Sequence, residues 1–103
     1  MMSHNRPIAF GWIDYDLSRA PDWDRAQIQR LARHLGYYLE WPCERSVLQV
    51  AVQAGNIAAD LVILPAPHHL SPLEINAVMH VADVETVVPR LSFARWAFGQ
   101  VPR

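Results

Sequence analysis

The stretch Ile8-Ala-Phe-Gly-Trp-Ile13 is a short apolar run that ends at Asp14-Tyr-Asp16. Its residues do not alternate between apolar and polar, which is typical of a strand buried on both faces of a parallel sheet. A second run of this kind, Leu61–Leu64, is followed by prolines. Because both faces of such strands must be covered, the two runs predict an α/β protein with helices on each side of its sheet.

Helical patterns lie between the apolar runs. In the first, apolar residues recur at the i, i+3, i+4, i+7 spacing of an amphipathic helix from Ile28 to Leu35. We expect Asp22 to cap this helix at its start and Gly36 to end it. A second helix is expected from Ser46 to Gly55 or beyond, although its valines leave a strand as the alternative.

The third helix has the clearest start signal in the sequence. Ser71-Pro-Leu-Glu74 offers a serine N-cap, a proline at the first helical position and a glutamate at the third. This helix is expected to run through Met79 to Ala82. Two further strands are expected at residues 37–41 and 84–88, each followed by a proline.

The resulting order is strand–helix repeated three times and closed by a fourth strand. With right-handed crossovers, it predicts a three-layer sandwich with a mainly parallel four-stranded sheet in the order 2-1-3-4, of the flavodoxin-like kind. The length of 103 residues fits a single domain over residues 1–103. Residues 1–7 and 90–103 are expected to be tails, the second with one short amphipathic turn.

Composition excludes several classes of protein. The formal net charge of -1 gives no bulk electrostatic attraction to nucleic acid or to an anionic membrane. One cysteine, Cys43, excludes an intrachain disulfide and a zinc site built from several cysteines. Residues 1–7 hold no apolar signal segment, and the apolar runs are far shorter than a membrane span. We therefore expect a cytoplasmic protein without a membrane partner.

Open parallel sheets bind ligands beyond the carboxyl ends of their strands, where the strand order reverses. The candidate residues in this crevice follow the first and third strands: Asp14, Tyr15, Asp16, Ser18, His68 and His69. One hypothesis is a metal-assisted phosphoesterase that uses the two carboxylates and the two imidazoles, which requires these four side chains to converge. The alternative is that the two carboxylates accept hydrogen bonds from backbone N–H groups of their own loop. We expect no cofactor.

With the order of elements established, the chain resembles the catalytic domain of serine recombinases, the resolvase and invertase family, over residues 8–89. The matches are Gly11-Trp-Ile13 before Asp14-Tyr-Asp16, the segment Asp24-Arg-Ala-Gln-Ile28 with Leu31 and Gly36, Ala54-Gly55 followed by Asp60-Leu-Val-Ile-Leu64, and His68-His-Leu70. They correspond to the family's Gly-Tyr-x-Arg-x-Ser, Asp-x-Gln-Ile, Gly-Asp-x-Leu-Val-Val and Asp-Arg-Leu motifs. The resemblance implies the same α/β fold.

The departures from the family lie at its active-site positions. Asp16 stands where the family has its serine nucleophile, and Asp14 where it has an arginine. His68 and His69 replace the Asp-Arg pair, and Pro72 replaces a later arginine. Carboxylates repel a phosphate, so the resemblance implies a domain without recombinase activity. The family's long dimer helix and DNA-binding domain are not expected in residues 90–103.

Our leading hypothesis is a catalytically inactive resolvase-like domain that acts as a protein-interaction or regulatory module. The candidate interface for self-association or a protein partner is the aromatic and basic tail: Arg90, Phe93, Arg95, Trp96 and Phe98. The alternative for this tail is packing against the protein's own sheet edge. A third hypothesis, a DNA-binding accessory factor of recombination, depends on Arg25, Arg30 and Arg33.

Overall fold

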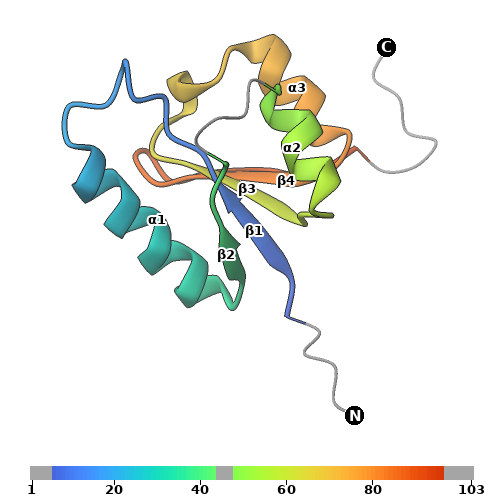
Figure 1. Cartoon of the computed structure of the whole chain (residues 1–103), viewed down its shortest axis with the longest axis horizontal. Coiled ribbons are helices and arrows are strands. Elements are labelled where there is room, and N and C mark those ends of the chain that lie inside the picture. The colour runs from blue at the N-terminus through green and yellow to red at the C-terminus, as the bar shows by residue number, and fades with distance from the viewer. Residues whose placement is uncertain (1–5, 44–47, 97–103) are drawn as a thin grey trace.

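The computed structural model describes residues 6–43 and 48–96, which form a mixed α/β domain (Figure 1). Its elements follow one another in the order β1 (Ile8–Gly11), α1 (Pro21–Leu35), β2 (Tyr38–Glu40), α2 (Val50–Asn56), β3 (Leu61–Leu64), the 3-10 turn η1 (Pro67–His69), α3 (Pro72–Met79), β4 (Asp83–Thr86) and β5 (Leu91–Phe93). Within the described residues, no helix has the length and hydropathy needed to cross a membrane.

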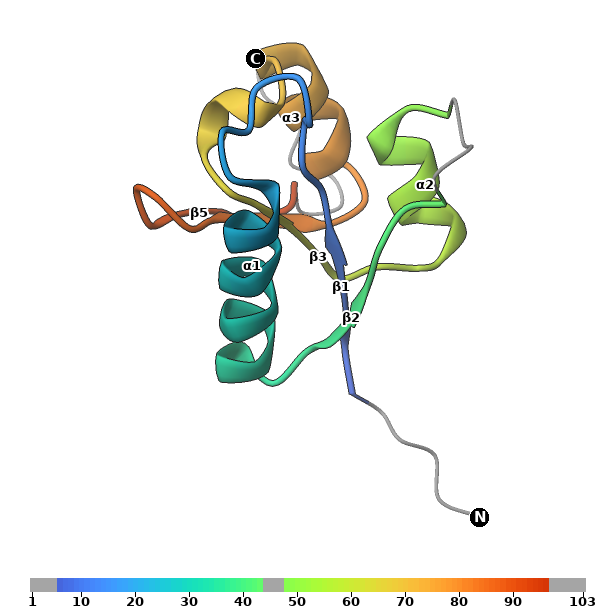
Figure 2. The ribbon, with the colours of Figure 1, turned by 60° about the vertical axis from the view of Figure 1, so that its left-hand side comes forward.

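The strands form one sheet in the order β2-β1-β3-β4-β5. All neighbours are parallel except β4 and β5, which are antiparallel. The predicted order of the first four strands and their parallel pairing are confirmed. β2 lies on one side of β1 in the sheet, and β3 and β4 lie on the other side. Right-handed crossovers then place α1 on one face and α2 and α3 on the other, as Figure 2 shows.

The sheet separates two apolar cores. On one face, Ile28 and Ala32 of α1 pack against Ala9, Leu61 and Ile63, all at most 2% exposed. On the other face, α2 and α3 cover the alternate residues of the same strands. The buried members of this second core are Phe10, Val50, Ala54, Ala59, Val62, Leu64, Leu70, Val78, Ala82 and Val84. Side chains from neighbouring positions of β1 and β3 enter both cores, which explains why their apolar runs do not alternate.

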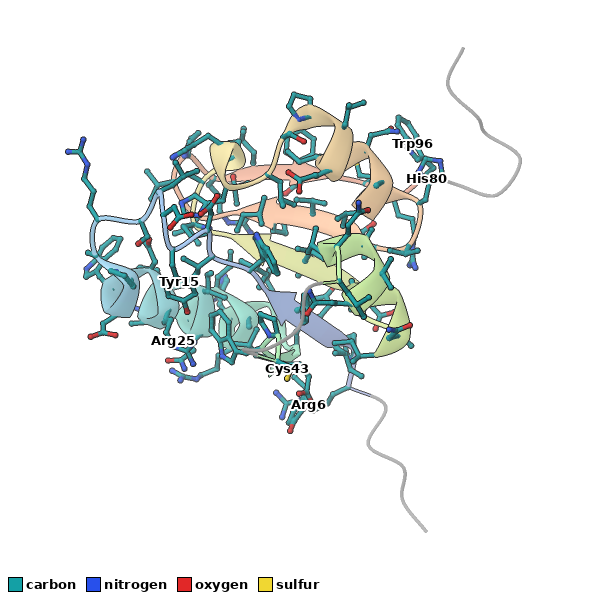
Figure 3. The ribbon with its side chains drawn as sticks, turned by 45° about the horizontal axis from the view of Figure 1, so that its top comes forward. Arg6, Tyr15, Arg25, Cys43, His80 and Trp96 are labelled. Atoms are coloured by element: carbon teal, nitrogen blue, oxygen red, sulfur yellow. The ribbon has the colours of Figure 1, made fainter. Side chains whose placement is uncertain are left out.

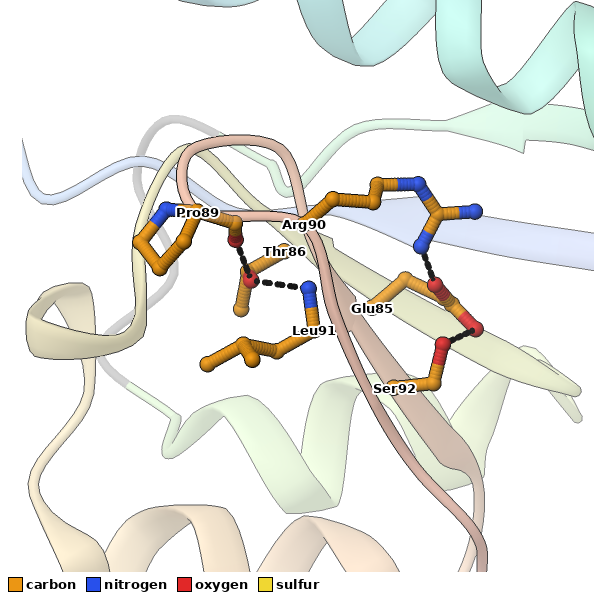
Figure 4. A network of polar contacts seen from close by, with 6 residues as sticks. All are labelled: Glu85, Thr86, Pro89, Arg90, Leu91 and Ser92. Atoms are coloured by element: carbon orange, nitrogen blue, oxygen red, sulfur yellow. Dashed lines mark hydrogen bonds and ion pairs between the residues drawn. The ribbon is translucent and has the colours of Figure 1, made fainter.

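The prediction of four strands was wrong, because β5 adds a fifth strand within the segment expected to be a tail. Buried Thr86 holds the connection between β4 and β5 (Figure 4). Its Oγ1 donates to the carbonyl of Pro89 and accepts the backbone N–H of Leu91 at 3.1 Å. Glu85 joins the two strands on the opposite face, where its carboxylate pairs with Arg90 and accepts the Ser92 hydroxyl at 2.7 Å.

Two helix starts differ from the prediction. α1 begins at Pro21 with Ala20 as N-cap, so Asp22 lies in the first turn and favours the helix dipole instead of capping. α2 is a helix, as expected, but begins at Val50 after the N-cap Gln49, and Ser46 lies outside the described residues.

Two other helix boundaries were predicted correctly. Gly36 ends α1 in the left-handed conformation, with φ of 84°. The capping box at the start of α3 is complete, because the Ser71 hydroxyl accepts the Glu74 N–H while the Glu74 carboxylate accepts the Ser71 N–H. The expected continuation of this helix to Ala82 was wrong, because α3 ends at Met79 with His80 as its C-cap.

Candidate functional site

The predicted crevice residues lie in two segments at the carboxyl edge of the sheet. The loop that follows β1 carries Asp14 to Ser18, and η1, which follows β3, carries His68 and His69. A hydrogen bond joins the two segments, because the backbone N–H of Asp14 donates to Nδ1 of His69 at 2.9 Å. The edge is therefore one structural unit in which residues far apart in the sequence bind each other.

His69 is held in its neutral form by this contact. An imidazole nitrogen that accepts a hydrogen bond carries no proton, so the remaining proton lies on Nε2. The side chain is buried, with 5% of its surface exposed. Burial lowers the pKa of His69, and the neighbouring His68 lowers it further, against smaller opposing effects of Asp24 and Asp14. His69 thus acts as a neutral acceptor that anchors the loop after β1.

The acidic and hydroxyl groups after β1 are bonded within their own turn. Oδ1 of Asp14 accepts the backbone N–H of Asp16 at 3.0 Å, and the Asp14 carbonyl accepts the N–H groups of Leu17 and Ser18. The Ser18 hydroxyl donates to Oδ2 of Asp24 at 2.6 Å, which ties the turn to the first turn of α1. The expected alternative for Asp14, acceptance of N–H bonds from its own loop, describes this arrangement.

The metal-assisted hypothesis required Asp14, Asp16, His68 and His69 to converge. All four are described, and among the described residues no group of three or more His, Cys, Asp or Glu side chains is arranged to hold a metal ion. His68 is exposed, and its ring is tilted by 55° from that of His69 at a centroid distance of 5.0 Å. The geometry that a metallophosphoesterase would need is not formed here.

A hollow of about 430 Å³ lies between the start of α1, η1 and the loop after β4. We call it the η1 hollow, and its lining is Leu17, Ser18, Arg19, Trp23, Asp24, Gln27, Pro65, Ala66, His68, His69, Val87 and Val88. Three large apolar side chains around it are exposed: Leu17 by 46%, Trp23 by 56% and Val88 by 58%. The hollow therefore has a mixed lining with a solvent-exposed apolar rim.

A second hollow, of about 340 Å³, lies at the carboxyl ends of β1 and β2. We call it the Trp41 hollow, and it is lined by Trp12, Ile13, Tyr15, Arg25, Trp41, Pro42, Cys43 and Gln53. Tyr15 lines this hollow. The other predicted crevice residues that line a hollow are Ser18, His68 and His69, and they line the η1 hollow. Figure 3 shows Tyr15 and Arg25 close together on the side of the molecule where Cys43 also lies.

Sequence reasoning did not find the Trp41 hollow. The available signal was that aromatic residues, Trp12 and Trp41, stand at the ends of both adjacent strands. It was missed because Arg25 and Gln53 come from helices on opposite faces of the sheet, and no local pattern shows that they meet.

The residues predicted as an interface in the tail make contacts within the chain. Arg90 pairs with Glu85, and Phe93 packs against the core on the α2 and α3 face. The backbone N–H of Arg95 donates to Oδ1 of Asp83 at 2.7 Å. Trp96 donates its backbone N–H to the carbonyl of Met79 at 2.8 Å and its indole N–H to Asn76 at 3.1 Å. Phe98 lies outside the described residues.

No protein-family model, curated protein or solved structure matches the chain in the comparisons made.

Proposed function

We propose that the chain is a catalytically inactive domain of the resolvase type that acts as a protein-interaction module through the η1 hollow. The observation that carries the proposal is the exposed rim of Leu17, Trp23 and Val88 around one hollow. Exposed apolar residues scattered singly need no explanation, whereas a group of them around a depression is typical of a contact surface. Tryptophan is also among the residues that contribute most to protein interfaces.

The polar groups at this edge support a role without catalysis. A nucleophile or general base needs a free lone pair and access to its substrate. Here Nδ1 of His69, the lone pair that a general base would use, is occupied by the Asp14 N–H. Asp14 and Asp16 also stand at positions where the resembling recombinases carry an arginine and a serine, so a phosphodiester would meet carboxylates.

The proposed partner is a protein that inserts an apolar side chain between Trp23, Leu17 and Val88. A volume of about 430 Å³ is large enough for one or two such side chains. Burying a large apolar side chain contributes about 1.5–3 kcal/mol. A second copy of this chain and a different protein are both partners of this chemistry, and the experiment below distinguishes them.

Site-specific photo-crosslinking in the native host tests the proposal. A photoreactive amino acid at position 17 should give a discrete adduct, and the Trp23→Ala substitution should reduce its yield by about tenfold. The matched control position is Leu73, which is 82% exposed on α3 and lies outside the hollow. The adduct mass shows whether the partner is a second copy.

Equal adduct yields at positions 17 and 73, or no adduct at position 17, would contradict the interaction surface. Nicking of supercoiled DNA by the purified chain would contradict the absence of catalysis, provided that Asp16→Asn and Ser18→Ala variants lose the activity.

A further inference from the structure

We propose that the Trp41 hollow binds a small aromatic carboxylate. This inference is independent of the interaction surface at the η1 hollow, because the two hollows share no lining residue. The hollow lies beyond the carboxyl ends of two parallel strands, where open α/β sheets bind their ligands. Its volume of about 340 Å³ lies within the range of small-molecule sites, which is about 300–1,000 Å³.

Arg25 supplies the charge that would recognise an anion. Arg25 is partly buried as a residue, its guanidinium lies 4.2 Å from the centre of the Trp41 ring, and Nη1 donates to the Tyr15 hydroxyl at 3.3 Å. Among the described residues, no carboxylate lies within ion-pair distance of Arg25. A guanidinium has five N–H donors in a planar fork that fits a carboxylate, and Tyr15 accepts from one of them.

The position of the Trp41 ring is fixed by the sheet. The ring packs directly on Gly11, where a Cβ atom would lie 2.6 Å from Cζ3 of the indole. It therefore presents a rigid apolar wall beside the guanidinium. Trp12 and Ile13 add to the apolar lining of the hollow, which suits a flat aromatic ring better than a flexible polar chain.

Gln53 gives the hollow an oriented acceptor. Its side chain is more than nine-tenths buried, and Nε2 donates to the carbonyl of Leu48 at 2.6 Å. This bond fixes the orientation of the amide, and Gln53 lines the hollow. The ligand class is therefore an aromatic ring with a carboxylate for Arg25 and a ring N–H or hydroxyl for Gln53, as in an indole or hydroxyphenyl carboxylate.

Titration with indole-3-acetate, followed by NMR of the tryptophan indole N–H signals, tests the proposal. The signals of Trp12 and Trp41 should shift on saturation, whereas those of Trp23 and Trp96 serve as internal controls because neither lines this hollow. The uncharged indole-3-acetamide should bind at least about tenfold more weakly, since a hydrogen bond to a charged group contributes about 1.5–3 kcal/mol.

Substitutions on α1 separate the role of Arg25 from a general charge effect. Arg25→Gln should weaken indole-3-acetate binding by about tenfold or more, and Arg25→Lys should restore part of it. Arg30→Gln is the matched control, because Arg30 is exposed on the same helix and does not line the hollow. Two-dimensional NMR spectra of each variant verify the fold.

Cys43 provides a second readout that does not depend on tryptophan. It is exposed, lines the hollow and is the one cysteine in the sequence, so its reaction with a thiol reagent reports occupancy. Bound indole-3-acetate should slow this reaction in wild type and in Arg30→Gln, but not in Arg25→Gln. Binding that is absent at millimolar ligand, unchanged in Arg25→Gln, or equal for the acetamide would overturn the proposal.

Discussion

Nδ1 of His69 accepts the backbone N–H of Asp14 across 55 positions of sequence, at a distance of 2.9 Å. The bond connects the turn after β3 to the loop after β1 at the edge of the sheet where both hollows lie. Because a protonated imidazole cannot accept this bond, the position of the loop depends on the charge of one buried side chain.

Acid should destabilise the protein through His69. Burial lowers the pKa of His69 in the folded state below its ordinary value of 6.5, so below that pH the unfolded chain binds a proton that the folded chain does not. The free energy of unfolding therefore has its full His69 contribution above pH 6.5 and decreases as pH falls below it. Urea denaturation between pH 5 and pH 7.5 measures the slope of the free energy of unfolding against pH.

The His69→Asn substitution isolates this effect. Its side-chain oxygen retains an acceptor close to the position of Nδ1 but does not titrate, so the slope should be shallower than in wild type. His34→Asn is the control, because His34 is exposed on α1 and should leave the slope unchanged. Equal slopes for wild type and His69→Asn would show that His69 does not determine the acid sensitivity.

Two glycine substitutions should have opposite effects on stability. In Gly11→Ala the new methyl group would lie 2.6 Å from the Trp41 ring, and we expect unfolding to become easier by about 1–3 kcal/mol. In Gly55→Ala the nearest atom, Cγ1 of Val81, lies at 4.0 Å, and the better helix propensity should stabilise α2 by about 0.5–1 kcal/mol. Chemical denaturation of both variants measures the change in the free energy of unfolding, which should be a decrease for Gly11→Ala and an increase for Gly55→Ala.

The capping box should contribute measurably to the stability of α3. Ser71→Ala removes the hydroxyl that accepts the Glu74 N–H at 3.1 Å, and the expected loss is about 1 kcal/mol. Ser71→Asp keeps an acceptor and should retain most of the stability. Thermal unfolding monitored by circular dichroism compares the two variants, and equal midpoints would argue against capping at this position.

Thr86 should be required for the antiparallel strand. Thr86→Val keeps the shape of this fully buried side chain but leaves the Leu91 N–H without its acceptor. We expect a loss of about 1–3 kcal/mol. Amide hydrogen exchange should show the loss of protection concentrated in β5, whereas β1 and β3 should keep the exchange pattern of wild type. Uniform loss across the sheet would contradict a local role.

The sequence predicted the parallel part of the fold because its signals are local. The unbroken apolar run of Leu61–Leu64, the capping box at Ser71 and the left-handed turn at Gly36 each depend on a few neighbouring residues. Short β5 has no such signal. Its three residues form a strand because Thr86 and Glu85 bind the returning chain, and that contact exists only after β4 is in place.

The candidate site was also predicted only in part. The meeting of the β1 and β3 loops followed from topology, so Asp14 and His69 were expected at one edge. Their actual contact uses a backbone N–H, which residue types do not reveal. The pairing of Arg25 with Trp41 was not predicted either, because the ring must first be positioned on Gly11 by the packing of two strands.

The antiparallel return of β5 has a practical consequence for handling the protein. Trp96 bonds to Met79 where α3 ends and β4 is about to begin, and Arg6 precedes the beginning of β1. The described chain therefore ends, after β5, at the edge of the sheet opposite the carboxyl ends of β1 and β3, whereas Arg6 lines a surface depression together with Trp41. A surface tether attached on the C-terminal side of β5 should leave both hollows open to solution, so protein immobilised there is suitable for binding measurements at each of them.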